Sequence, residues 1–149
     1  MSRFVRPQTT TLALTRGDTI TVKTRLTSGE QRDAFARMYI AGMDGRLRAN
    51  PLQTGLAMMV AYLIDWSLTD DDGQPVPIKG LPIAELESVL NTLEPESFTE
   101  IKLAIERHEG AMAAARDVEK KTIPDGEPNA GAILASRSAA DGVLTGSAI

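Results

Sequence analysis

The sequence of 149 residues contains no cysteine, a single histidine and only 4% aromatic residues. Without cysteine the chain can form no disulfide framework, no thiolate nucleophile and no cysteine-ligated zinc site. Because His108 is the only histidine, neither a site of several histidines nor an HExxH motif can be built. His108 stands between Arg107 and Glu109 in a helical pattern, so we expect a surface or boundary histidine without a catalytic role.

The motifs that mark many catalytic and ligand-binding sites are also missing. The chain has no GxxxxGK(S/T) or GxGxxG loop to cradle a phosphate, and no serine lies in a GxSxG elbow. The cluster Asp70–Asp72 with Gly73 resembles part of a calcium loop, but the EF-hand register would put Leu68 and Lys79 at positions that need acidic ligands. We therefore predict a non-enzymatic protein with no catalytic residue, no cofactor and no metal site.

The hydrophobic runs are too short for a membrane protein. The longest, Leu56–Ile64, falls far below the roughly 20 apolar residues that span a bilayer. The N-terminal residues 1–7 include no apolar core of the length found in a signal peptide. A soluble, intracellular protein without a membrane partner is expected.

Charge is distributed unevenly along the chain. The net charge is −4, but residues 1–48 hold nine Lys and Arg against four Asp and Glu, whereas the remainder holds seven against sixteen. An acidic chain is atypical of a general nucleic-acid binder, and the basic residues here alternate with threonine instead of stacking aromatics. The acidic run at 85–100 falls across two expected helix starts, where the macrodipole favours anions. The layout also suits charge-matched assembly between chains.

Residues 9–26 predict a β-hairpin. Leu12 and Leu14, then Ile20, Val22 and Leu26, alternate with threonine and basic residues, as in half-buried strands. The segment 15–18 between them, Thr-Arg-Gly-Asp, supplies the glycine and aspartate of a tight turn.

A helical part follows over residues 27–121. Thr27 and Glu30 form a capping box, and the helix that they open carries Phe35, Met38 and Tyr39 before it ends at Gly42 and the Asp-Gly pair at 44–45. Asn50 and Pro51 begin a second, almost wholly apolar helix that reaches Ile64. Two further helices are expected at about 82–93 and 95–121, the latter beginning at Pro95 or at a capping box of Ser97 and Glu100.

Between the helices, residues 66–78 predict a short hairpin or extended flap at an edge, because Pro75 and Pro77 cannot donate to a strand ladder. Residues 122–149 are rich in Ala, Gly and Ser and predict a flexible tail. The expected fold is α+β and mainly α: one globular domain over 1–121, with the N-terminal hairpin packed on a bundle of about four helices.

The stretch from Asn50 to Ile78 resembles the tail assembly chaperones of long-tailed bacteriophages. In both, an apolar helix leads into a Trp-polar-apolar segment (Trp66-Ser67-Leu68), an acidic Gly turn (Asp70–Gly73) and a Pro-apolar strand (75–78). A helical pair and a small-residue tail follow, and the similarity covers residues 10–121. The resemblance implies a non-enzymatic assembly factor in the host cytoplasm that binds the tape measure protein and helps recruit tail-tube subunits around it.

A helical client needs an adaptable apolar surface, and methionine supplies adaptability. We hypothesise that Met38, Met58, Met59, Tyr62 and Trp66 line a surface for a client or for self-association. The alternative is that these five residues belong to an ordinary core. Two other functions remain open: a virion structural protein, such as a head–tail connector or minor tail component, and a small DNA-binding regulator.

Overall fold

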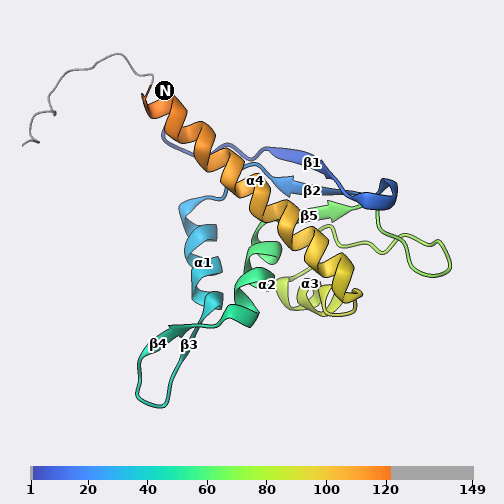
Figure 1. Cartoon of the computed structure of the whole chain (residues 1–149), viewed down its shortest axis with the longest axis horizontal. Helices are drawn as coiled ribbons and strands as arrows, with labels where there is room; N and C mark the ends of the chain where they lie inside the picture. The colour runs from blue at the N-terminus through green and yellow to red at the C-terminus, as the bar shows by residue number, and fades with distance from the viewer. Residues whose placement is uncertain (1, 122–149) are drawn as a thin grey trace, which may run out of the picture. The chain divides into compact units, whose positions relative to one another are not determined.

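The computed structural model describes residues 2–121, which contain four α-helices and two small antiparallel sheets (Figure 1). The predicted α+β class is therefore confirmed. Contacts between residues divide the chain after Met112, so the described residues fall into a first unit, 2–112, and a second that begins at Ala113. None of the helices in residues 2–121 is long and apolar enough to cross a lipid bilayer. The tail expected at 122–149 lies outside the described residues.

The predicted N-terminal hairpin is confirmed. β1 (Thr9–Ala13) pairs antiparallel with β2 (Thr19–Lys23), and the short 3-10 turn η1 (Thr15–Gly17) connects them. Arg16 and Gly17 both have a positive φ, 61° and 78°, as the central residues of a type I′ turn require. Glycine adopts this conformation without strain, whereas Arg16 accepts it at some cost.

A third strand that the sequence did not predict completes this sheet. β5 (Leu63–Trp66) pairs antiparallel with β2, which gives the order β1-β2-β5. The helix expected to reach Ile64 therefore ends earlier: α2 spans Pro51–Tyr62, and the chain enters β5 at the next residue. Trp66, which was expected in the flap, is the last residue of this strand. The sequence does not show where α2 ends and β5 begins, because buried helices and buried strands both consist of apolar residues.

The helix α1 (Ser28–Met38) begins at the predicted capping box. Thr27 Oγ1 accepts a hydrogen bond from the Glu30 N–H at 3.2 Å, and Glu30 Oε1 accepts one from the Thr27 N–H at 2.9 Å. The expected end near Gly42 is wrong, because the chain leaves α1 after Met38 and forms a second hairpin.

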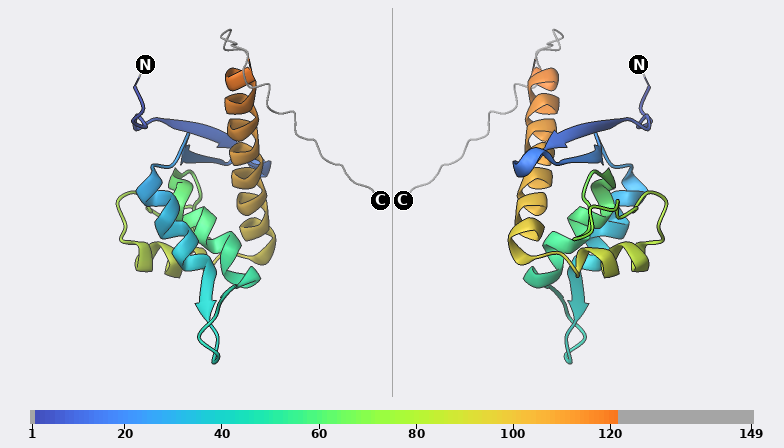
Figure 2. Two further views of the ribbon diagram at one scale, coloured as in Figure 1. Left: turned by 90° about the vertical axis from the view of Figure 1, so that its left-hand side faces the viewer. Right: turned by 90° about the vertical axis from the view of Figure 1, so that its right-hand side faces the viewer.

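This second hairpin pairs β3 (Tyr39–Ala41) with β4 (Leu47–Ala49). The pair Asp44-Gly45, which was interpreted as a helix end, forms the turn of this hairpin, and Gly45 has a φ of 78°. Asn50 then caps α2 as predicted, since its side chain accepts a hydrogen bond from the Leu52 N–H at 3.1 Å. The two side views show the hairpin extending away from the neighbouring helices (Figure 2).

The remaining elements follow the sequence closely. The expected flap is reduced to a single bridge between Thr69 and Pro75, closed by a turn in which Asp70 Oδ1 accepts hydrogen bonds from the Asp72 and Gln74 N–H groups. α3 spans Ile83–Leu90, and α4 spans Pro95–Lys121. The helix thus begins at Pro95 and not at Ser97.

One main core cluster joins the three-stranded sheet to α2, α3 and α4, and a smaller cluster of Ala34, Met38 and Ala57 joins α1 to α2. Ile20 and Val22 from β2, Met59 from α2, and Ile101 and Ile105 from α4 are each 0–1% exposed in the main cluster. Ile20 and Val22 of the N-terminal hairpin therefore pack among helix residues, and residues 95–112 of α4 pass across the sheet (Figure 1). Deep burial of aliphatic side chains is the main source of stability for such a unit.

Candidate functional site

The five predicted partner-binding residues lie in or against the core. Met38, Met59 and Tyr62 are 9%, 0% and 5% exposed, so they present almost no surface to another molecule. Met58 and Trp66 are half-buried and pack against the same clusters. The structure thus places all five as core or core-boundary residues and does not bring them together as an exposed groove, which favours the ordinary-core alternative.

Trp66 has a structural contact of its own. Its indole Nε1–H donates a 2.7 Å hydrogen bond to the carbonyl oxygen of Val76, which lies beyond the Thr69–Pro75 bridge. A buried indole nitrogen usually needs such an acceptor. The bond ties the end of β5 to the segment that leads toward α3.

His108 is buried, and the expectation of a surface or boundary histidine was wrong. Only 7% of it is exposed, its Nε2 lies 3.0 Å from the carbonyl oxygen of Lys23, and its ring meets the ring of Tyr62 edge to face at 6.0 Å. These contacts connect α4 to the end of β2 and to α2. Within residues 2–121 no cluster of three or more His, Asp or Glu side chains could hold a metal ion.

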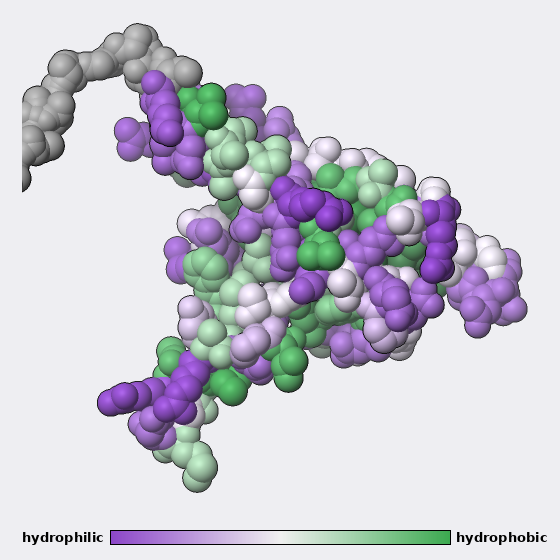
Figure 3. Space-filling model, in the orientation of Figure 1, coloured by the Kyte–Doolittle hydropathy of each residue, from purple (hydrophilic) through white to green (hydrophobic). Residues whose placement is uncertain are grey.

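The most conspicuous exposed surface lies instead at the second hairpin. Six of the ten exposed large apolar side chains in the described part of the chain fall between residues 35 and 52. We call them the hairpin patch: Phe35, Tyr39, Ile40, Met43, Leu47 and Leu52. Figure 3 shows hydrophobic surface on this hairpin and at its base, interrupted by strongly hydrophilic side chains.

Exposure in the hairpin patch is high even for a surface loop. Ile40 is 53% exposed, Leu47 71% and Leu52 88%, and Met43 is as exposed as in an open chain. Scattered single apolar residues on a surface are ordinary, but six large ones on one hairpin and the helix ends beside it make a candidate interaction site or an aggregation liability. The two strands are also short, and within the described residues each pairs only with the other.

Charged residues hold the shape of this hairpin. Arg48 Nη2 makes a 2.8 Å ion pair with Asp44 Oδ2 across the turn. A Cβ on Gly42 would come within 2.9 Å of the ends of both side chains, which would have to shift to make room for it. Arg46 adds a further positive charge beside the apolar side chains.

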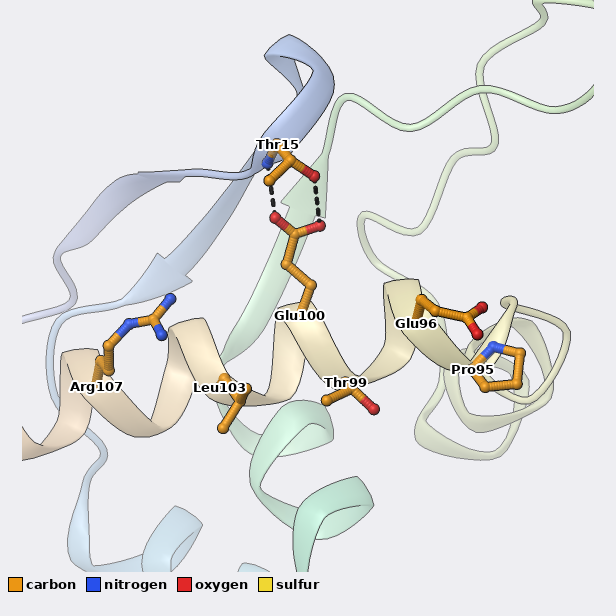
Figure 4. A pocket seen from close by; sticks show the side chains of 7 residues that line it. All are labelled: Thr15, Pro95, Glu96, Thr99, Glu100, Leu103 and Arg107. Carbon is orange, nitrogen blue, oxygen red and sulfur yellow. Dashed lines mark hydrogen bonds between the residues drawn. The ribbon is translucent and has the colours of Figure 1, made fainter.

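A second surface feature is an open pocket with a volume of about 490 Å³. It lies where the turn of the first hairpin meets the start of α4 (Figure 4). Glu100 points toward Thr15 and accepts hydrogen bonds from its backbone N–H at 2.6 Å and from its Oγ1 at 3.0 Å. Arg16 Nη1 lies 3.5 Å from Glu94 Oε1. Part of the acidic run therefore contacts the basic hairpin turn within one chain, where the sequence suggested contact between chains.

Three of the basic residues in the first 48 positions are engaged in ion pairs. Arg16 pairs with Glu94, Lys23 with Glu30, and Arg48 with Asp44. Phosphate binding relies on unpaired Lys and Arg charge. The pairs reduce the basic charge that this half of the chain can offer to DNA.

None of the five predicted residues belongs to the hairpin patch, although one sequence signal pointed to it. Asp44-Gly45 is a strong hairpin signal when strand-forming residues flank it, and Tyr39 and Ile40 precede it while Leu47 follows it. The signal was interpreted as a helix end because the preceding residues continue a helical spacing. No family model, no curated protein and no solved structure matches this chain.

Proposed function

We propose that the chain is a tail assembly chaperone of a long-tailed bacteriophage, a non-enzymatic factor that acts in the host cytoplasm. In this proposal it binds the tape measure protein and helps recruit tail-tube subunits around it. The observation that carries the proposal is the hairpin patch, because a folded domain that leaves six large apolar side chains uncovered has an energetic reason to bind another apolar surface.

The shape of the hairpin patch suits a helical client. In the register of the hairpin, Tyr39 and Leu47 lie on one face and Ile40 on the other, so a long helix that lies along the hairpin can contact the apolar side chains of one face at a time. Tyr39 and Met43 add a rigid aromatic anchor and an adaptable side chain, both of which are enriched at protein interfaces. Arg46 places a charge at the margin, where acidic residues of a client would be attracted.

Co-expression with the tape measure protein of the same phage tests this proposal. The wild-type chain should keep the tape measure protein soluble and should co-purify with it. The double variant Ile40→Ser, Leu47→Ser should reduce the co-purified amount by about tenfold or more, since central apolar anchors each contribute about 1 kcal/mol or more to binding. Both residues are exposed, so the variant should fold normally.

The matched control is Leu103→Ser, which removes an apolar side chain that is 41% exposed on α4, outside the hairpin patch. It should co-purify like the wild type. Equal retention by all three proteins, or no complex with the wild type, would contradict the proposal.

The virion structural alternative predicts a different location for the chain. A head–tail connector or minor tail component stays in the mature particle, whereas a chaperone leaves it. Mass spectrometry of purified virions therefore separates the two functions: the proposed chaperone should be absent. Stoichiometric recovery from virions would favour the structural alternative.

A further inference from the structure

The first strand of the three-stranded sheet has one edge without a paired strand among the described residues. β1 stands at the end of the order β1-β2-β5, and Figure 1 shows it as the outermost strand of the sheet. Hydrogen bonds at its two ends fix which residues face β2. The Thr24 N–H donates to the Gln8 carbonyl oxygen at 2.9 Å, and the Leu14 N–H donates to the Asp18 carbonyl oxygen at 2.8 Å.

Backbone bonds alternate along an antiparallel pair, so Thr10 and Leu12 also bond to β2, whereas the residues between them do not. Thr9, Thr11 and Ala13 therefore point their N–H and C=O groups toward the open side of the sheet. All three residues are exposed, and no turn or loop in residues 2–121 bonds to these groups. Such a row of donors and acceptors matches another strand and not a helix, whose backbone groups bond within the helix.

The other strand edges of the described chain carry protection that β1 lacks. On β5, the Trp66 N–H points away from β2 and donates to Asp65 Oδ1 at 2.9 Å, and the register with β2 shifts between Thr21 and Val22. In the second hairpin, β4 carries the charge of Arg48. Charges and bulges of this kind keep natural edges from pairing with other chains. The sequence of β1, Thr-Thr-Thr-Leu-Ala, contains no charge, and its register with β2 is unbroken.

We propose that the free edge of β1 pairs with the same edge of a second copy of this chain. The two strands run antiparallel about Thr11, so Thr11 faces the partner's Thr11 and Thr9 faces the partner's Ala13. Each of these pairs exchanges two backbone hydrogen bonds, and a two-fold axis passes through the central pair. The proposal uses no residue of the hairpin patch and does not depend on the proposed function.

Two features favour a second copy over a strand of an unrelated protein. Thr10 and Leu12 lie on the same face of the sheet as the buried Ile20 and Val22. Pairing about Thr11 sets Thr10 beside the partner's Leu12, so the helix-covered face of one sheet continues into that of the other. Because the strand is uncharged, no charge meets its own copy, and threonine opposite threonine is a favourable cross-strand pair.

Sedimentation velocity of the full chain between about 10 μM and 1 mM measures the pairing. Two five-residue strands form a small interface, so we expect a weak dimer with a Kd on the order of 100 μM. Thr11→Lys puts like charges opposite each other at the two-fold axis and should raise this Kd by about fivefold. The matched control Thr69→Lys changes another exposed threonine, in the Thr69–Pro75 bridge, and should dimerise like the wild type.

A mixture of two charge variants tests the symmetry of the contact. Thr11→Glu alone should dimerise as weakly as Thr11→Lys. An equimolar mixture of the two should recover the dimer, because opposite charges then face each other, and this recovery requires that position 11 meets itself. Both variants change an exposed side chain, so each should keep the Tm of the wild type within a few degrees.

Amide hydrogen exchange followed by NMR reports on the edge itself. In dilute protein, the N–H of Thr11 should exchange faster than those of Thr10 and Leu12, which bond to β2. At about 1 mM, exchange at Thr9, Thr11 and Ala13 should slow by about fivefold, since most of the chain is then dimeric.

Any of four results would overturn the proposal: a chain that stays monomeric at 1 mM, equal weakening by Thr11→Lys and Thr69→Lys, no recovery in the mixture, or unchanged exchange at Thr11. The Ile40→Ser, Leu47→Ser variant should dimerise like the wild type. Loss of its dimer would place the contact at the hairpin patch and would also overturn the proposal. Because client binding is measured separately, failure of the edge and failure of the proposed function are distinguishable.

Discussion

The two hairpins of this chain both turn through a glycine but have opposite surroundings. Each turns through a glycine with a φ of 78°, Gly17 in the first and Gly45 in the second. In the first, Ile20 and Val22 are completely buried, and β5 covers one edge of the pair. In the second, Ile40 and Leu47 are more than half exposed. Turn chemistry forms a hairpin, but tertiary partners decide whether its side chains become core or surface.

The two hairpins should differ most in the stability that is lost when a large apolar side chain is truncated to alanine. We expect Ile20→Ala to reduce the free energy of unfolding by about 2–5 kcal/mol, since it leaves a cavity in a packed core. The same change in the second hairpin, Ile40→Ala, should cost no more than about 0.5 kcal/mol because that side chain is largely exposed. Urea denaturation followed by circular dichroism measures both. Similar losses would mean that the second hairpin is also packed in solution.

The turn contact is expected to have the next largest effect. Glu100→Ala removes both hydrogen bonds to Thr15 and should cost about 1 kcal/mol, as charge-assisted bonds at an exposed site do. Amide hydrogen exchange at residues 14–18 should become faster. The control Glu96→Ala changes a carboxylate that lines the same open pocket, and it should leave exchange in the turn unchanged.

A smaller effect is expected from the ion pair that links the first hairpin to α1. Because the pKa of Glu30 is lowered in the folded chain, its ionisation stabilises the fold above the unfolded pKa of about 4.3, and this contribution is lost as pH falls through the folded pKa. The difference in Tm between wild type and Glu30→Gln should therefore shrink between neutral pH and about pH 3. A difference that stays constant over this range would contradict it.

The smallest effect on stability should come from the hairpin patch. Leu47→Ser is expected to change the free energy of unfolding by less than about 0.5 kcal/mol, because the leucine is 71% exposed. The variant should elute earlier than the wild type from a hydrophobic-interaction column. A large loss of stability would show that Leu47 is covered in solution.

Sequence reasoning succeeded where local chemistry specifies the backbone. The hairpin turn that uses Gly17, the capping box of Thr27 with Glu30, and the cap at Asn50 all rest on neighbours within four residues. It failed where distant partners decide. β5 forms because β2 offers an open edge, and nothing between Leu56 and Ile64 marks the point at which the helix must end.

His108 is a different case, because a local signal existed. It lies three residues after Ile105 and seven after Ile101, on the same face of α4 as these two buried side chains. The charged neighbours Arg107 and Glu109 suggested a surface position, although neighbours at i±1 point elsewhere on a helix. For the candidate site, the methionine content drew attention to core residues, whereas the second hairpin was missed because its Asp44-Gly45 signal was interpreted as a helix end.

The late position of β5 in the chain has a consequence for synthesis on the ribosome. Ile20 pairs with Trp66, so the hairpin is complete long before its third strand has been made. At ordinary translation rates this interval lasts on the order of a few seconds, during which the outer edge of β2 and its apolar face have no partner. Exposed strand edges of this kind recruit other strands. The newly made chain therefore passes through a stage in which the edge of β2 can pair with a strand of another chain.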